Sequence, residues 1–375
     1  MTPADKVADQ YVILQQEIFG MLIDTIKGVR PRLTDLKAEE MVEWRIKALA
    51  QMDALTQQVI DYVKKQSPTI AKAVDEVIKR DGLKVSQEFN QDLAKLLNQQ
   101  IKPVSAETMQ VLDSYAAQTW KSLDNNVNQS LLSTNVGKNP ALKVYQDILN
   151  KSTLAATTGL KTPQEAIFDT VDSWINKGLP TTLIDKGGHK WSLEGYTRTV
   201  ITTTTLRTYN DVRMQSLKDY NQTLAIMTSH PAARPACAPI QGKVVNTVDH
   251  GHPQFNPKYP TIYDYGYGTP AGTLGINCMH QLYPYVEGVT INRQKHYDEQ
   301  EAIKNGQIQQ MQRYYERQVR KWKQRKDAAE RIGNTNLVAK CNSAIRGYQS
   351  KIRQLVHEND FLTRQYDRES TWVGR

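Results

Sequence analysis

The sequence predicts a mainly α-helical protein with a small central α+β module, a helical N-terminal region and a C-terminal antiparallel helical hairpin. Two observations support this prediction. Apolar residues recur at every third or fourth position toward both ends of the chain, which is typical of amphipathic helices. Between these regions, residues 223–292 are rich in proline, glycine, histidine and cysteine, which favour turns and polar clusters over helices.

The chain has 375 residues, enough for about two or three domains of ordinary size. Changes in composition divide it into four parts. They are a helical N-terminal region at 1–135, a loop and helices leading into the core domain at 136–222, the motif-rich α+β module at 223–292 and the hairpin at 293–375.

The N-terminal region has the periodicity of successive helices. An apolar stripe that includes Val7 and Leu14 predicts a first helix, and a similar pattern predicts a second helix over residues 35–65. Ser67–Pro68 predicts the start of another helix, because serine caps helices and proline suits the first helical position. Gly82 predicts the end of that helix.

The next segment is expected to be less regular. Residues 125–159 are rich in asparagine, serine and threonine, which predicts a loop with a short helix at 141–150. Thr162 and Glu165 form a capping-box pattern, in which the glutamate side chain reaches back to the amide of the capping residue. The helix that follows is predicted to end at Gly178.

The module is expected to begin after one more turn and helix. The adjacent glycines in Asp185–Ser192 predict a tight turn, with Ser192 capping a helix over residues 193–212 despite its β-branched centre. Residues 224–228 and 243–248 are the best strand candidates. Most of residues 252–285 is predicted to be loop, because proline, glycine and tyrosine dominate there.

The C-terminal part has a near-heptad apolar pattern interrupted at Gly333-Asn334, which predicts an antiparallel helical hairpin. Cys341 lies on the apolar seam and is therefore expected to be a small core residue. The seam residues are Ile308, Met311, Tyr315, Val319 and Trp322 before the break, then Val338, Cys341, Ile345, Tyr348, Ile352, Leu355, Leu362 and Tyr366.

Charge and cysteine content restrict the class of protein. The net charge is +9 and the pI is about 9.2, which favours an anionic partner such as nucleic acid. Three cysteines are too few, and odd in number, for a disulfide framework. The N-terminus has no pattern of a secretory signal, and no segment is apolar enough to cross a bilayer. Synthesis in a reducing cytoplasm is therefore expected.

The module contains a candidate Cys/His cluster made of His230, Cys237, Cys278 and His280. These residue types can bind zinc, although the closely spaced cysteine pairs of structural zinc sites are missing. Either cysteine could also act as a nucleophile with a histidine base. The third interpretation is two turns packed together, with histidine and Arg234 hydrogen-bonding to loop carbonyls. We expect no cofactor and no enzymatic activity.

A basic run in the hairpin is the candidate nucleic-acid contact. Val319 and Trp322 are expected to lie on the seam, so the cations around them should spread over the outward side. Such a face can contact phosphates without reading sequence. The alternative is a solvated helix face paired with nearby acids. The candidate residues are Arg320, Lys321, Lys323, Arg325 and Lys326.

Several motifs occur in a specific order from residue 185 onward. They are Asp185-Lys186-Gly187-Gly188-His189-Lys190-Trp191-Ser192, Ser229-His230 with Ala233-Arg234-Pro235 and Cys237, Gln241-Gly242-Lys243, Gly275-Ile276-Asn277-Cys278 with His280, Tyr283-Pro284-Tyr285, Gln318–Lys323 and Arg364–Glu369. In this order they resemble the motifs of the phage minor capsid protein 2 family, which is related to the Mu F-type head-morphogenesis proteins. The resemblance covers roughly residues 160–370 and is looser over the N-terminal helices.

The resemblance implies a minor structural component of a tailed phage head. Such proteins join the procapsid through the portal protein and take part in head assembly, DNA packaging or DNA delivery. The expected partners are therefore the portal protein, the capsid interior and packaged double-stranded DNA, and the expected location is the head interior. The N-terminal helices would contact the portal or capsid. The resemblance supplies no catalytic residues.

Overall fold

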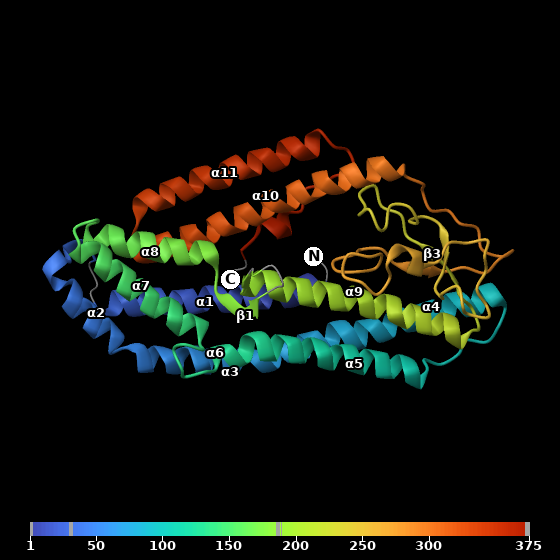
Figure 1. Cartoon of the computed structure of the whole chain (residues 1–375), viewed down its shortest axis with the longest axis horizontal. Coiled ribbons are helices and arrows are strands. Elements are labelled where there is room, and N and C mark those ends of the chain that lie inside the picture. The colour runs from blue at the N-terminus through green and yellow to red at the C-terminus, as the bar shows by residue number, and fades with distance from the viewer. Residues whose placement is uncertain (1–2, 30–32, 185–187, 189, 372–375) are drawn as a thin grey trace.

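A computed structural model describes residues 3–29, 33–184, 188 and 190–371. The molecule is an elongated helical body with a loop-rich module at one end (Figure 1). The helices are α1 (Pro3–Val29), α2 (Met41–Leu49), α3 (Met52–Asp75), α4 (Asp81–Leu97), α5 (Ala106–Leu123), α6 (Gln129–Leu131), α7 (Pro140–Thr157), α8 (Pro163–Lys177), α9 (Leu193–Asp219), α10 (Glu299–Ile332) and α11 (Thr335–His357). The strands are β1 (Pro180–Ile184), β2 (Lys190–Ser192), β3 (Leu224–Met227), β4 (Val244–Asn246) and β5 (Leu282–Pro284).

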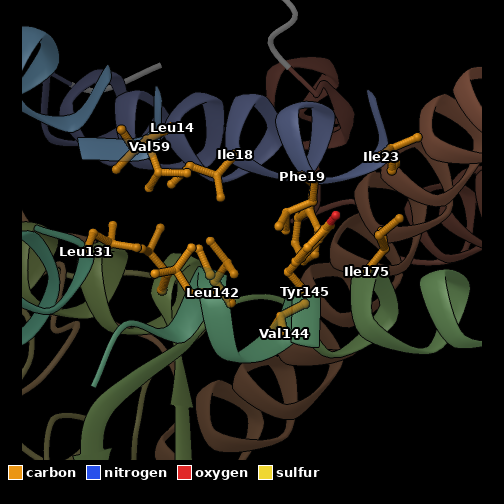
Figure 2. Packing of buried hydrophobic residues seen from close by; sticks show 14 of the residues in the cluster. Leu14, Ile18, Phe19, Ile23, Val59, Leu131, Leu142, Val144, Tyr145 and Ile175 are labelled. Carbon is orange, nitrogen blue, oxygen red and sulfur yellow. The ribbon is translucent and has the colours of Figure 1, made fainter. Parts of the chain in front are cut away.

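The main hydrophobic core lies between α1, α3, α7 and α8. Figure 2 shows Leu14 and Ile18 of α1 facing Leu142 of α7 across this core. Tyr145 is fully buried there, and its hydroxyl donates a hydrogen bond to the carbonyl oxygen of Ala48 at 2.9 Å. Burying each large apolar side chain contributes about 1.5–3 kcal/mol, so this cluster is a principal source of stability.

The same core crosses the boundaries drawn from composition. It contains residues of α1 and α3 from the first part, of α7 and α8 from the second, and Ala328 and Ile332 of α10 from the fourth. The two short strands β1 and β2 pair as an antiparallel ribbon that was not predicted. The division into four parts stays a prediction.

The predicted helix start at Ser67–Pro68 and stop at Gly82 are both wrong. Pro68 lies inside α3, and a π-helical segment, Glu76–Arg80, joins α3 to α4. The hydroxyl of Ser67 donates to the carbonyl oxygen of Val63 at 2.8 Å instead of capping a new helix. A Cβ atom on Gly82 would lie 2.5 Å from Cδ2 of Leu112 in α5. Gly82 therefore permits close helix packing rather than ending a helix.

The predicted loop at 125–159 is also wrong over most of its length. A π-helical segment, Asp124–Asn128, and α6 continue from α5, and α7 extends to Thr157. Asn139 starts α7, because its side-chain oxygen accepts hydrogen bonds from the amides of Ala141 and Leu142 at 3.0 and 3.3 Å. The polar residues of this segment favour a loop prediction, although Asn139 caps a helix of 18 residues.

The predicted capping motifs of the next two helices are confirmed. Thr162 and Glu165 make the reciprocal bonds of a capping box, and Gly178 terminates α8. Ser192 accepts a hydrogen bond from the amide of Gly195 and so caps α9. Asp185–Gly187 and His189 of the expected turn lie outside the described residues.

The module contains a three-stranded antiparallel sheet in the order β4-β3-β5. Ala225 at its centre pairs with Val245 on one side and Pro284 on the other. Strands β3 and β4 were predicted, whereas β5 falls in the segment expected to be loop. The rest of 252–285 lacks strands apart from a single isolated bridge at Thr261, and its one helical turn is the 3-10 segment Ile262–Tyr265.

The C-terminal hairpin is confirmed. Gly333 ends α10 with a φ of 84°, a conformation that glycine adopts without strain, and Asn334 caps α11 through the amide of Leu337. Cys341 of α11 is fully buried, as the sequence predicts for a core residue. Tyr366 lies past the end of α11 and is 67% exposed, so the predicted helical seam stops earlier than the sequence pattern. Figure 1 shows α11 as the outermost helix, lying over α10.

Among the described residues, no helix is both long and apolar enough to span a membrane.

Candidate functional site: a Cys/His cluster and the hairpin cations

Hydrogen bonds between two loops bring the predicted Cys/His cluster together. The first loop leaves β3, carries His230 and Cys237, and returns at Gly242, whose amide donates to the carbonyl oxygen of Met227 at 3.0 Å. The second loop carries Cys278 and His280 into β5. The amide of Thr228 donates to the carbonyl oxygen of Gln281 at 2.9 Å, which ties the two loops together.

Three of the predicted residues place their ligating atoms within 4.8 Å of one another: Cys237, Cys278 and His280. The two Sγ atoms are 3.7 Å apart, and Sγ of Cys278 is 3.4 Å from Nδ1 of His280. All three side chains are buried, with Cys237 fully enclosed. His230 lies beside them, with its ring centroid 4.7 Å from that of His280.

Gln241 organises the two histidines. Its side-chain oxygen accepts a hydrogen bond from the backbone amide of His230 and lies 3.0 Å from Nε2 of His280. Gln241 is itself buried. This residue was part of the motif group in the sequence, but its bonding role could not be inferred before the fold was known.

The remaining motif residues hold the loops in place. The Arg234 guanidinium donates to the carbonyl oxygens of Gly272 and Ile276, at 2.8 and 3.0 Å. Asn277 adopts a φ of 55°, and its amide donates to the hydroxyl of Thr203 in α9. Lys243 has an exposed side chain and contributes through its backbone, whose carbonyl accepts from Met227. These contacts match the hydrogen-bonded turns that the sequence left open as one interpretation.

The pKa values in the cluster move in directions set by its hydrogen bonds and burial. The hydrogen bond with Cys278 and the proximity of His280 hold the pKa of the Cys237 thiol below its usual range. The pKa of Cys278 is raised by the same hydrogen bond and by burial. Burial and the neighbouring His280 lower the pKa of His230. The sulfur atoms are enclosed, which is unfavourable for a nucleophile that must meet an external substrate.

Helix α9 attaches the module to the helical body through residues that the sequence analysis did not select. The side-chain amide of Asn210 donates to the carbonyl oxygen of His280 at 3.0 Å, and its oxygen accepts from the amide of Leu282. Arg213 donates to the side-chain oxygen of Gln281 at 3.0 Å. The available signal was the spacing of three residues between Asn210 and Arg213, which places both on one face of a helix.

The predicted outward position of the α10 cations is wrong for two of the five. Arg320 is 7% exposed and pairs with Glu194 of α9 at 3.0 Å. Arg325 forms two hydrogen bonds of 2.6 Å with Asp172 of α8 and stacks over the ring of Trp322. These arginines join α10 to the body, because their guanidinium groups are directed at carboxylates of other helices.

The other three cations of the run are partly exposed: Lys321, Lys323 and Lys326. Lys326 lies 3.5 Å from the carboxylate of Glu330 one turn away. Their contact with DNA stays a prediction.

Helix α11 presents a different cationic surface that the sequence analysis missed. Residues 335–357 contain no aspartate or glutamate, and the exposed cations of this helix are Lys340, Arg346, Lys351 and Arg353. None of the four forms an ion pair with a carboxylate within the described part of the chain. Lys351 lies over the rings of Tyr315 and Tyr348. The signal in the sequence was the 23-residue stretch without acids.

The comparisons with known proteins agree with the order of the motifs. The model of the family described as phage minor capsid protein 2 matches residues 2–357. The chain belongs to this family. A phage minor capsid protein of this kind is a structural component of a bacteriophage virion, and the resemblance inferred from the motifs is confirmed.

Two relatives of the family member described here carry the same general description. A structural protein of Lactococcus phage LL-H is 90% identical over 368 residues, which cover 98% of this chain and 99% of that protein. A structural protein of Lactococcus phage mv4 is 91% identical over 117 residues, which cover 31% of this chain and 95% of that protein. No solved structure matches the chain.

Proposed function

We propose that this minor capsid protein joins the phage head through the portal protein, lies in the head interior and assists head assembly, DNA packaging or DNA delivery. The observation that supports the proposal is the family match over residues 2–357. The elongated body suits a structural role, because α1, α3, α5 and α9 run along its length (Figure 1). The proposal includes no catalytic step, and the two cysteines of the module are enclosed.

Coexpression with the portal protein of the same phage tests this proposal. The two proteins should coelute from a sizing column at moderate salt and should still coelute after nuclease treatment. A variant lacking residues 3–29 is not a useful probe, because α1 contributes to the main core. Surface substitutions on α2, where Val42 and Ile46 are exposed at 48% and 59%, probe the contact without removing core residues. Separate elution of the wild-type proteins would overturn the proposal.

A second function is favoured by the surface of α11. We propose that this helix contacts packaged double-stranded DNA without sequence preference. Cations that lack intramolecular carboxylate partners are available to phosphates, and each phosphate contact releases counterions from DNA. The four exposed cations of α11 meet this condition better than Arg320 and Arg325, whose charges are already neutralised by the body.

Salt dependence tests the second function. The purified chain should bind unrelated duplexes of equal length with similar affinity, and the logarithm of the binding constant should fall linearly with the logarithm of salt concentration. A strong preference for one sequence, or affinity that does not change with salt, would overturn this assignment.

A further inference from the structure

We propose that Cys237, Cys278 and His280 form a zinc site that joins the two loops of the module. The proposal is independent of the role in the phage head. Cys237 comes from the loop between β3 and β4, whereas the other two residues come from the segment that enters β5. A metal ion here would cross-link segments that are 41 residues apart in sequence.

Two of the three distances between the donor atoms fit a tetrahedral zinc ion, and all three ligating atoms lie within 4.8 Å of one another. With Zn–S bonds of about 2.3 Å and Zn–N bonds of about 2.0–2.1 Å, tetrahedral angles place two sulfur atoms roughly 3.8 Å apart and a sulfur and a nitrogen roughly 3.6 Å apart. The structure has 3.7 Å between the two sulfur atoms and 3.4 Å between Sγ of Cys278 and Nδ1 of His280. The pocket is thus arranged as a ligand set.

The hydrogen bonds of Gln241 set the tautomer that a metal requires. The backbone amide of His230 can only donate, so the side-chain atom of Gln241 that faces it must be the oxygen. That oxygen also lies 3.0 Å from Nε2 of His280, so Nε2 carries the proton and donates. Nδ1 of neutral His280 therefore presents its lone pair toward the sulfur atoms. Histidine ligands of metals typically donate their other N–H to an oxygen in this way.

His230 is assigned outside the ligand set. Its Nε2 lies 3.3 Å from the hydroxyl of Thr228, and a backbone hydrogen bond at Met279 also acts on its ring. The three protein ligands leave the fourth coordination position to an oxygen from solvent. Binding of Zn²⁺ releases the protons of the two thiols and leaves both sulfur atoms as thiolates.

The test measures metal in the full-length protein purified from zinc-supplemented cells without chelator. About one zinc per chain is expected by elemental analysis, with less than about a tenth of that in C237S and H280A. The matched control is C341S, which removes a buried cysteine of the hairpin and should keep its zinc. H230A should also keep it, and loss of zinc in H230A would overturn the three-ligand assignment.

A second measurement keeps the proposal testable if the cluster variants fail to fold. Replacing zinc by Co²⁺ in the wild-type protein should give the intense visible bands of tetrahedral cobalt and a sulfur-to-cobalt charge-transfer band. A zinc chelator should lower the unfolding temperature of the wild-type protein and of C341S alike. The proposal would be overturned if the purified protein contained only traces of zinc and showed no cobalt bands after Co²⁺ was added. A Cys237–Cys278 disulfide, found by mass spectrometry after alkylation without reduction, would also overturn it.

Discussion

Helices α10 and α11 are both basic, but two arginines of α10 are neutralised by carboxylates of other helices, whereas the exposed cations of α11 are not, in the part of the chain that the structure describes. The cations of α10 include Arg320 and Arg325, which form ion pairs with Glu194 and Asp172 on other helices. The four exposed cations of α11 have no such partners among the described residues, and α11 packs on α10 rather than on the body (Figure 1). The comparison teaches that a dense basic run in a sequence is not the same as a basic surface.

The largest effect is expected where α10 meets α9. Replacing Glu194 by glutamine leaves the guanidinium of Arg320 largely buried without its carboxylate, which should lower the free energy of unfolding by about 3 kcal/mol. The matched control is E330Q, because Glu330 is exposed and pairs with Lys326 only within α10. That change should cost at most about 0.5 kcal/mol in urea unfolding at neutral pH. Equal losses in the two variants would show that α10 is not anchored by its arginines.

The ion pair between Glu194 and Arg320 also predicts how the free energy of unfolding depends on pH. Burial would raise the pKa of Glu194, but Arg320 and Arg198 outweigh it and hold the pKa below the ordinary 4.5. A carboxylate with a lowered folded-state pKa contributes stability that is present above the unfolded value and lost as the pH falls through the folded value. The stability difference between wild type and E194Q should therefore be constant above about pH 5.5 and shrink below pH 4.5. Urea titrations at stepped pH measure it, and a difference that grows on acidification would contradict this sign.

A smaller effect is expected at the start of α10. A Cβ on Gly306 would lie 2.6 Å from the carbonyl oxygen of Ala233, in the stretch where Asn305 also donates to Pro231. G306A should therefore destabilise the protein by about 1–3 kcal/mol, since backbone atoms of the module must move. Thermal unfolding followed by circular dichroism would measure the change. An unchanged or raised midpoint would mean that this contact with the module is loose.

The corresponding glycine of α11 gives the opposite expectation. Gly347 lies inside α11, where a Cβ would meet no atom within 4 Å. G347A should stabilise the protein by about 0.5–1 kcal/mol, because alanine loses less backbone entropy than glycine in a helix. The same unfolding experiment serves for both variants. A destabilised G347A would indicate that the outer side of α11 is already packed against another surface in the purified protein.

The sequence predicts most reliably those helices whose ends carry capping residues. The hairpin, α8 and α9 were predicted correctly because Thr162, Ser192 and Gly333 occupy cap positions that the sequence displays. Pro68 and Gly82 misled the prediction. The buried face of α3 continues past the proline, and the glycine is required by Leu112 of a distant helix.

The candidate site was only partly predictable. The residue types of the module indicate a polar cluster, but the lack of a closely spaced cysteine pair in the sequence argues against a metal site. The fold brings Sγ of Cys237 within 3.7 Å of Sγ of Cys278, because backbone hydrogen bonds at the end of β3 hold the two loops together. Asn210 donates a hydrogen bond to the module because its face of α9 packs against the module, and no local sequence pattern predicts which face of a helix does so. The same holds for Arg320, whose partner is 126 residues away.

The most direct test of α11 as the DNA-facing helix is the salt dependence of DNA binding by two neutralised variants. One variant carries K340Q, R346Q, K351Q and R353Q on α11. The other carries K47Q, R80Q, K84Q and K161Q, which removes the same charge from exposed cations that already pair with carboxylates. The slope of log affinity against log salt should fall by about 3–4 for the α11 variant, near 0.9 per phosphate contact, and stay close to wild type for the control. If the slope fell equally in both variants, DNA binding would depend on net charge alone. That result would contradict the assignment of α11 as the DNA-facing helix.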